Sequence, residues 1–126
     1  MSLSNTFETT TLQWLFTTTS VTRPTAWYLA LFTVAPGEGG GGTECSGTSY
    51  ARQSFTFTVS GDTATNAANV EFPVAGSSWG TLVAVGVFDA VSGGNLIAYG
   101  NLTTSKTIDT GDVFRIPAGD LDITLN

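Results

Sequence analysis

Short segments rich in β-branched and aromatic residues recur at fairly even spacing along this chain, with turn-forming residues between them. Residues 26–33 (AWYLALFT) and 81–89 (TLVAVGVFD) are apolar on both faces of an extended chain, which is typical of central strands. Residues 53–59 and 120–126 alternate apolar with polar side chains, as half-buried strands do. Further short strands are expected at residues 69–72, 96–102 and 113–116. About seven strands at this spacing predict a mainly β fold, either a compact sandwich or an open barrel.

Residues 5–17 have a different pattern, in which apolar side chains recur at helical spacing. Asn5, followed three residues later by Glu8, predicts an N-terminal cap for this helix. Its apolar face is expected to consist of Phe7, Leu12, Trp14, Leu15 and Phe16. Threonines on the opposite face lower the intrinsic stability of the helix. The helix therefore needs a packing partner, which is either the sheet of its own chain or a neighbouring subunit.

A glycine-rich stretch at residues 36–49 (PGEGGGGTECSGTS) predicts a long loop. The glycine run at residues 39–42 has no side chains to pack, and its backbone entropy is high when it is free. Loops of this length inside a compact domain are usually functional or disordered. One interpretation is a flexible connector, and the other is a loop that becomes ordered against a neighbouring subunit.

Size and charge limit the partners of the chain. Its 126 residues (13.1 kDa) suit one domain, which we take to span residues 1–126. The net charge is −6 and the four basic residues are scattered, which argues against nucleic acid and against anionic membrane surfaces. The sequence has no signal-peptide pattern and no apolar run of about 18 residues. We therefore expect synthesis in the cytoplasm and no membrane partner.

The residue types that most enzymes use are scarce in this chain. It contains no histidine and Cys45 is its one cysteine, which excludes a Ser-His-Asp triad, a Cys-His pair, an internal disulfide and a zinc site. Asp109 with Asp112 brackets a turn, where Asp bonds to the local backbone. Asp120 and Asp122 alternate with apolar residues, so both are expected to point to solvent rather than to form a glycosidase pair. Calcium-loop and phosphate-loop motifs are absent, and we expect no catalytic residue, cofactor or metal.

Three tryptophans could stack on a sugar, anchor an interface or lie in the core. Trp27 belongs to a predicted central strand and Trp14 to the predicted helix, so core packing is the expected role of both. Trp79 lies in a short Gly-Ser loop (GSSWG), where both the core and the interface interpretations stay open.

Four segments, in order along nearly the whole chain, form a joint pattern. They are the opening helix with residues 26–31 (AWYLAL), residues 49–53 (SYARQ), residues 78–89 (SWGT with the following strand) and residues 118–125 (AGDLDITL). In this pattern the chain resembles a family of small bacteriophage proteins, often called tail-fibre-like, some of which serve as capsid cement or decoration proteins. The resemblance implies a structural protein of the virion without catalysis, and it leaves open whether the protein sits on the head or on the tail.

Two functions fit this resemblance. In the first, the protein is a capsid cement protein, which binds the outside of the major capsid shell and stabilises it against internal pressure. The small size of the chain and its lack of a fibrous repeat favour this function. In the alternative, it is a tail or tail-fibre component that takes part in host-surface recognition through exposed aromatic side chains. A carbohydrate hydrolase has the least support, because no acid/base pair is convincingly placed.

The first function predicts a location in the virion, on the capsid surface. The predicted partners are the major capsid protein and neighbouring copies of this chain, within a homo-oligomer in the particle. The residues expected to contact them are Phe7, Trp14, Glu38, Gly40, Glu44, Tyr50 and Trp79.

Overall fold

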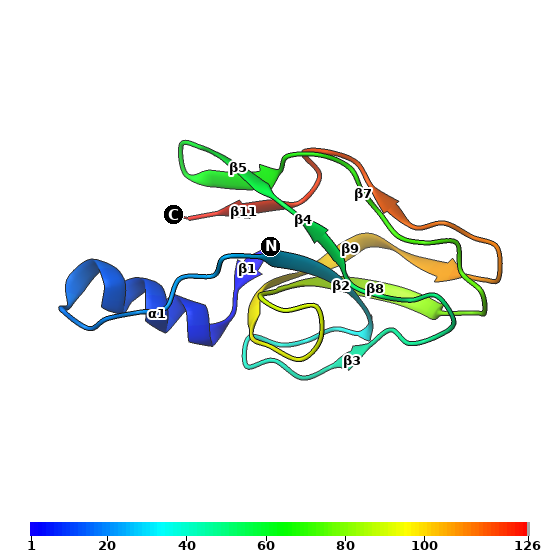
Figure 1. The fold of residues 1–126 in the computed structure, drawn as a ribbon, viewed down its shortest axis with the longest axis horizontal. Coiled ribbons are helices and arrows are strands. Elements are labelled where there is room, and N and C mark those ends of the chain that lie inside the picture. The colour runs from blue at the N-terminus through cyan, green and yellow to red at the C-terminus, as the bar shows by residue number, and fades with distance from the viewer. Residues whose placement is uncertain (126) are drawn as a thin grey trace.

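The computed structural model describes residues 1–125. In chain order the helix and strands are β1 (Ser2–Leu3), α1 (Asn5–Phe16), β2 (Trp27–Val34), β3 (Thr43–Glu44), β4 (Gln53–Phe55), β5 (Phe57–Ser60), β6 (Thr63–Asn66), β7 (Val70–Glu71), β8 (Gly80–Phe88), β9 (Leu96–Ile108), β10 (Arg115–Ile116) and β11 (Asp122–Thr124) (Figure 1). All strand pairs in this part of the chain are antiparallel, and the sheets are open. The prediction of a mainly β fold with one N-terminal helix is confirmed.

The largest sheet has six strands in the order β1-β9-β8-β2-β3, with β4 paired to β2 as well. At its centre, β2 pairs with β8 from Tyr28 opposite Phe88 to Phe32 opposite Ala84. Both strands are covered on their two faces, because apolar side chains pack on either side of the sheet. This position explains why the two segments that are apolar throughout form the middle of the sheet.

The main core lies between this sheet and a second layer made of the two smaller sheets, β10-β7 and β11-β6-β5 (Figure 1). Leu29 and Leu31 of β2 are fully buried in it. The second layer contributes Val70, Phe72, Phe114, Ile116 and Leu121. A smaller cluster on the opposite face of the large sheet consists of Ala30, Phe32 and Ala84, with Val83 and Phe88 packed against them.

The predicted strand at residues 53–59 is divided at Thr56. Its first half, β4, pairs with β2 in the large sheet, and its second half, β5, pairs with β6 in a smaller one. The Thr56 carbonyl accepts a hydrogen bond from the amide of Ala67 (2.9 Å), so at this residue the chain changes sheets. The alternation of side chains continues across the division: the rings of Phe55 and Phe57 lie on the same side of the chain, with their centroids 4.8 Å apart. The sequence pattern therefore does not reveal the division.

Strand β9 extends six residues beyond its predicted end at residue 102. Leu82 of β8 lies opposite Lys106, whereas Ala84 lies opposite Asn101, so residues 102–105 of β9 bulge out against the single residue Val83. The strands that the sequence did not predict, β1, β3 and β6, are short, and β6 (TATN) carries no large apolar side chain.

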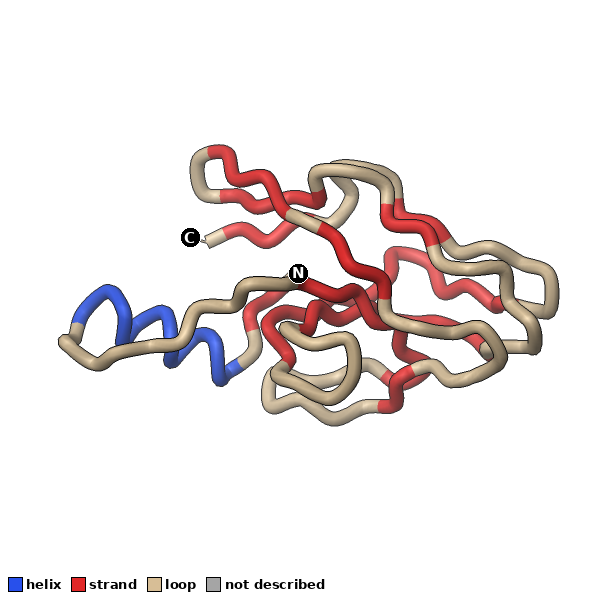
Figure 2. The backbone as a smooth tube through the Cα atoms, viewed as in Figure 1, coloured by secondary structure: helices blue, strands red, loops and turns tan. Residues whose placement is uncertain are grey.

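The N-cap residue of helix α1 is Ser4, one residue before the expected cap Asn5. The Ser4 hydroxyl accepts from the amide of Phe7 (3.4 Å) and donates to the carbonyl of Leu96 (2.6 Å), which ties the start of the helix to β9. From there the helix projects beyond the sheets, and the chain after it runs back beside the helix toward β2 (Figure 2). We call the helix and this returning segment, residues 5–24, the arm.

Candidate assembly surface

The arm exposes large apolar side chains. No residue of α1 is buried, and the exposed fraction is 66% for Trp14 and 77% for Phe16. Leu12 and Leu15 are also more than half exposed. Full burial of one such side chain is worth about 1.5–3 kcal/mol, so burial of this helix against a partner would be strongly favourable. The interpretation of Trp14 as a core residue is therefore wrong for the isolated chain, and its interpretation as a contact residue stays a prediction.

Only the base of the arm packs on its own chain. Phe7 is half-buried against the main core. Farther out, a shallow groove separates the helix from the returning segment, and Trp14, Val21, Arg23 and Pro24 line it together with Phe7. Phe7 and Trp14, both predicted contact residues, therefore lie on the same part of the surface.

A second apolar groove opens at the base of the arm. Thr11 of α1 forms one wall, and the other walls come from the strands beside it. We call this cavity of about 390 Å³ the basal groove; its apolar lining includes Leu3, Trp27, Phe57, Val59, Ile123 and Leu125. Val59 is 71% exposed and Leu125 is more than half exposed, so the groove is incompletely covered. Asp62 is the one ionisable residue among the described residues that line it.

The glycine-rich loop is ordered by the rest of the chain. β3 within it pairs with β2, and the amide of Gly40 donates to the carbonyl of Gly37 (2.9 Å). The Glu38 carbonyl accepts from the amide of Asn5 (2.9 Å), which joins the loop to the start of the arm. Glu38 is exposed and Gly40 is half-buried with a φ of 86°. Both line a polar cleft that also contains Glu44, away from the apolar groove of Phe7 and Trp14.

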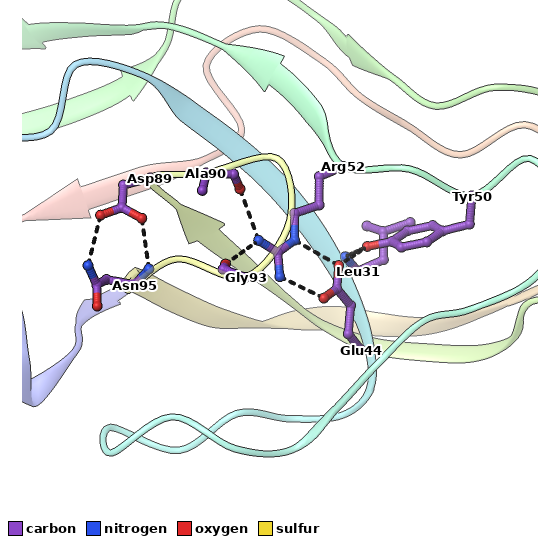
Figure 3. A network of polar contacts seen from close by, with 8 residues as sticks. All are labelled: Leu31, Glu44, Tyr50, Arg52, Asp89, Ala90, Gly93 and Asn95. Carbon is purple, nitrogen blue, oxygen red and sulfur yellow. Dashed lines mark hydrogen bonds and ion pairs between the residues drawn. The ribbon is translucent and has the colours of Figure 1, made fainter.

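Glu44 takes part in a polar network with Arg52 and Tyr50 (Figure 3). The Arg52 side chain donates to both carboxylate oxygens of Glu44, at 2.9 and 2.8 Å, and the Tyr50 hydroxyl donates to one of them at 2.7 Å. Arg52 also donates to the carbonyls of Ala90 and Gly93, and its guanidinium lies 3.8 Å above the ring centroid of Phe88. This network joins β3 to the loop between β8 and β9.

The network also changes the pKa values of its members. Burial alone raises the pKa of Glu44, but the hydrogen bonds from Arg52 and Tyr50 and the positive charge of Arg52 outweigh burial and hold the pKa below its usual 4.5. Burial and the hydrogen bond to Glu44 raise the pKa of Tyr50. Burial raises the pKa of Cys45 to about 11, so its thiol stays protonated near neutral pH. All three groups therefore favour a structural role over catalysis.

Trp79 is a core residue. Its exposed fraction is 2%, its ring packs edge-on against Tyr50 and Phe72, and its indole nitrogen donates to the carbonyl of Thr48 (3.1 Å). Tyr50 stacks on Phe72 in the same cluster and donates its hydroxyl proton to Glu44. Trp79 is thereby corrected from a predicted contact residue to a core residue, because the loop that carries it folds inward over the core.

The structure therefore divides the predicted contact residues among three places. Two lie on the arm, three line the cleft of the glycine-rich loop, and two stack in the core. The sequence analysis missed the basal groove, and the signal for it was weak: Val59 lies on the apolar side of alternating strand β5, and Leu125 continues the apolar side of β11 one residue past its end.

The acidic pairs behave as turn and surface residues. The Asp112 carboxylate accepts from the amide of Asp109 (2.9 Å), which confirms a role in the turn, and Asp120 and Asp122 are exposed as expected. No three Cys, Asp or Glu side chains within residues 1–125 lie together in a way that could hold a metal ion. Over the same residues, no helix has the length and apolar character needed to cross a membrane.

The glycine run provides a test of how the loop is held. Gly42 has a φ of 70°, and a methyl group there would meet the carbonyl of Val34 and lie 2.7 Å from the carbonyl oxygen of Ala35. We expect Gly42→Ala to lower the free energy of unfolding by about 1–3 kcal/mol. Gly39→Ala is the matched control, because a methyl group at Gly39 meets nothing within 4 Å. Chemical denaturation of both variants measures the difference, and equal stabilities would show that the loop is a loose connector.

Comparison with protein families gives a match to this chain. None of the curated proteins compared matches this chain. A protein-family model described as podophage GP4 fiber I protein gp80 matches residues 2–124, nearly the whole length. The exposed apolar arm agrees with a structural role of this kind. The chain therefore belongs to the bacteriophage fibre protein family of the podophage GP4 fiber I protein gp80.

Proposed function

We propose that this protein is a structural subunit of a tail fibre and that the arm attaches it to a neighbouring subunit in the particle. The observation that carries this proposal is the projecting helix, whose large apolar side chains are exposed beyond the body of the protein. The polar groups inside the body are satisfied, since no buried polar side-chain atom among residues 1–125 lacks a hydrogen-bond partner. The exposed apolar side chains of the arm are therefore the feature of this chain that most needs a partner.

Family membership confirms the prediction of a bacteriophage virion protein that is structural and not an enzyme. It also supports the fibre interpretation over the capsid cement interpretation that the sequence favoured. The small size of the chain and the absence of a fibrous repeat favoured a location on the capsid head. Several copies or partners can, however, supply the length of a fibre that one short chain does not have. Host-surface recognition is a further part of this proposal, because a fibre subunit lies where the particle meets the cell.

The test is to locate the protein and its arm variant in purified particles. In phage carrying Trp14→Ser with Phe16→Ser, we expect at least a tenfold loss of the protein from the particle, since the arm then lacks its largest apolar side chains. In wild-type particles separated into heads and tails, we expect the protein in the tail fraction. Quantitative mass spectrometry of each fraction gives the copy numbers, and adsorption to host cells gives the functional effect.

The matched control is Val74→Ser with Val91→Ser, two similarly exposed apolar residues outside the arm. We expect this variant to be incorporated at the wild-type level. Wild-type protein found with the head shells would overturn the fibre proposal in favour of capsid cement. Unchanged incorporation of a folded arm variant would show that the arm is not the attachment surface.

A further inference from the structure

We propose that the partner of the arm is a second copy of this chain, and that the apolar end of each arm inserts into the basal groove of a neighbouring copy. This inference deepens the proposed function and rests on its statement that the arm is an attachment surface. Both surfaces of the contact come from the same chain, because each copy carries an apolar arm and an apolar basal groove.

The two surfaces complement each other in chemistry. The arm end presents Leu12, Leu15 and Phe16, and the basal groove presents Phe57, Val59 and Leu125. A cavity of about 390 Å³ holds a few large side chains but not a whole helix, which is about 10–12 Å across. Insertion of side chains from one face of the helix therefore suits the size of the groove.

An arm cannot fill the groove of its own chain. Thr11 is the residue of α1 that lines the basal groove, and Phe16 lies more than one helical turn beyond it, at the end of a helix that projects away from the sheets (Figure 1). The base of the helix is fixed by the hydrogen bonds of Ser4 and by the packing of Phe7. Folding the end back would break the helix, so occupation by another copy is the geometry that remains for this pair of surfaces.

Charge favours the same contact. Copies with a net charge of −6 repel one another, so they need a contact region with little negative charge. Arg23 lies on the arm and Asp62 on the rim of the basal groove. The one ion pair within residues 1–125 joins Arg52 to Glu44, so neither Arg23 nor Asp62 has an ionic partner among these residues. An arm seated in a neighbour's groove brings these opposite charges to the same contact.

The contact draws its free energy from the apolar side chains at the arm end, because Leu12, Leu15 and Phe16 are each more than half exposed in the isolated chain. Full burial of one such side chain is worth about 1.5–3 kcal/mol. Because arm and groove are different surfaces, copies exchange arms in pairs or pass them head to tail around a ring.

The experiment uses the purified full chain and two variants that each lose one side of the contact. Leu12→Ser with Phe16→Ser removes the arm side, and Val59→Asp removes the groove side. We expect wild-type protein to self-associate at micromolar concentration in analytical ultracentrifugation, and each variant to associate at least tenfold more weakly. A mixture of the two variants is expected to regain association, because the first keeps an intact groove and the second keeps an intact arm.

Circular dichroism and denaturation of each variant establish that it is folded, and Val74→Ser with Val91→Ser serves as the surface control. A second measurement exchanges the charges: Arg23→Asp or Asp62→Arg alone weakens association, and the two together restore it. Wild-type protein that stays monomeric, or folded variants that fail to complement each other, would overturn this inference. If the arm variant were still lost from particles in that case, the attachment role of the arm would stand and its partner would be another virion protein.

Discussion

Trp79→Ala is expected to lower the free energy of unfolding by about 4 kcal/mol, in the middle of the range for removal of a buried aromatic side chain. Trp79 packs between Tyr50 and Phe72, with ring centroids at 5.5 and 6.5 Å, and almost none of its surface reaches solvent. The substitution leaves a cavity in an aromatic cluster and removes one of the two donors to the Thr48 carbonyl, which also accepts from the amide of Gly76. Urea denaturation followed by circular dichroism measures the change.

Trp14→Ala is the matched control, since it removes the same side chain from an exposed position. At concentrations where the protein is monomeric, we expect Trp14→Ala to change stability by no more than about 0.5 kcal/mol. A loss below about 1 kcal/mol for Trp79→Ala would contradict its place in the core and would return it to the set of possible contact residues.

Arg52→Ala is expected to lower the free energy of unfolding by about 2–3 kcal/mol. Removal of one member of a fully buried ion pair costs about 3–5 kcal/mol, and the expected loss is smaller here because Glu44 keeps some contact with solvent. The substitution also removes the donors for the carbonyls of Ala90 and Gly93 and the cation above Phe88. Arg52→Lys retains the charge but not the planar set of donors, so it should recover less than half of the loss.

The pH dependence of stability is the second measurement on this network. Because the pKa of Glu44 in the folded protein is below its usual 4.5, its carboxylate stabilises the fold above that pH, and the contribution is lost as the pH falls through the folded value. The stability difference between wild type and Arg52→Ala is therefore expected to be full at pH 7 and to shrink below about pH 4. Lys106→Ala, at an exposed position, is the control and should show no such difference. An unchanged difference in acid would mean that the ion pair contributes little.

The central strands were predictable because their signal is local. Residues 26–33 and 81–89 were expected to be strands, and the structure has them at Trp27–Val34 and Gly80–Phe88. A strand buried on both faces needs apolar residues at successive positions, and that requirement is visible in a short window of sequence. The break at Thr56 was not predictable, since side chains alternate in the same way on both sides of it.

The candidate site was predicted less well, because it depends on contacts between distant segments. Local context placed Trp14 in the core and left Trp79 open, but the helix projects and the loop of Trp79 folds inward. Glu44 lies in the glycine-rich loop and Arg52 lies just after it. The turns between them bring their side chains together, and no rule of sequence spacing predicts such a pair. Of the predicted contacts, Phe7 and Trp14 keep their place on the surface that we propose for assembly.

The bulge at residues 102–105 of β9 affects how safely many copies can be packed together. Beyond its short pairing with β1 at Ala98 and Tyr99, β9 forms an outer strand of the large sheet. A straight outer strand offers a row of free amides and carbonyls on which another chain can add, and this leads to uncontrolled aggregation. The bulge bends this row out of line, and Lys106 adds a charge beside it. Copies held close together by their arms would therefore stay separate along their sheet edges, so that the particle gains an ordered appendage rather than an amyloid-like deposit.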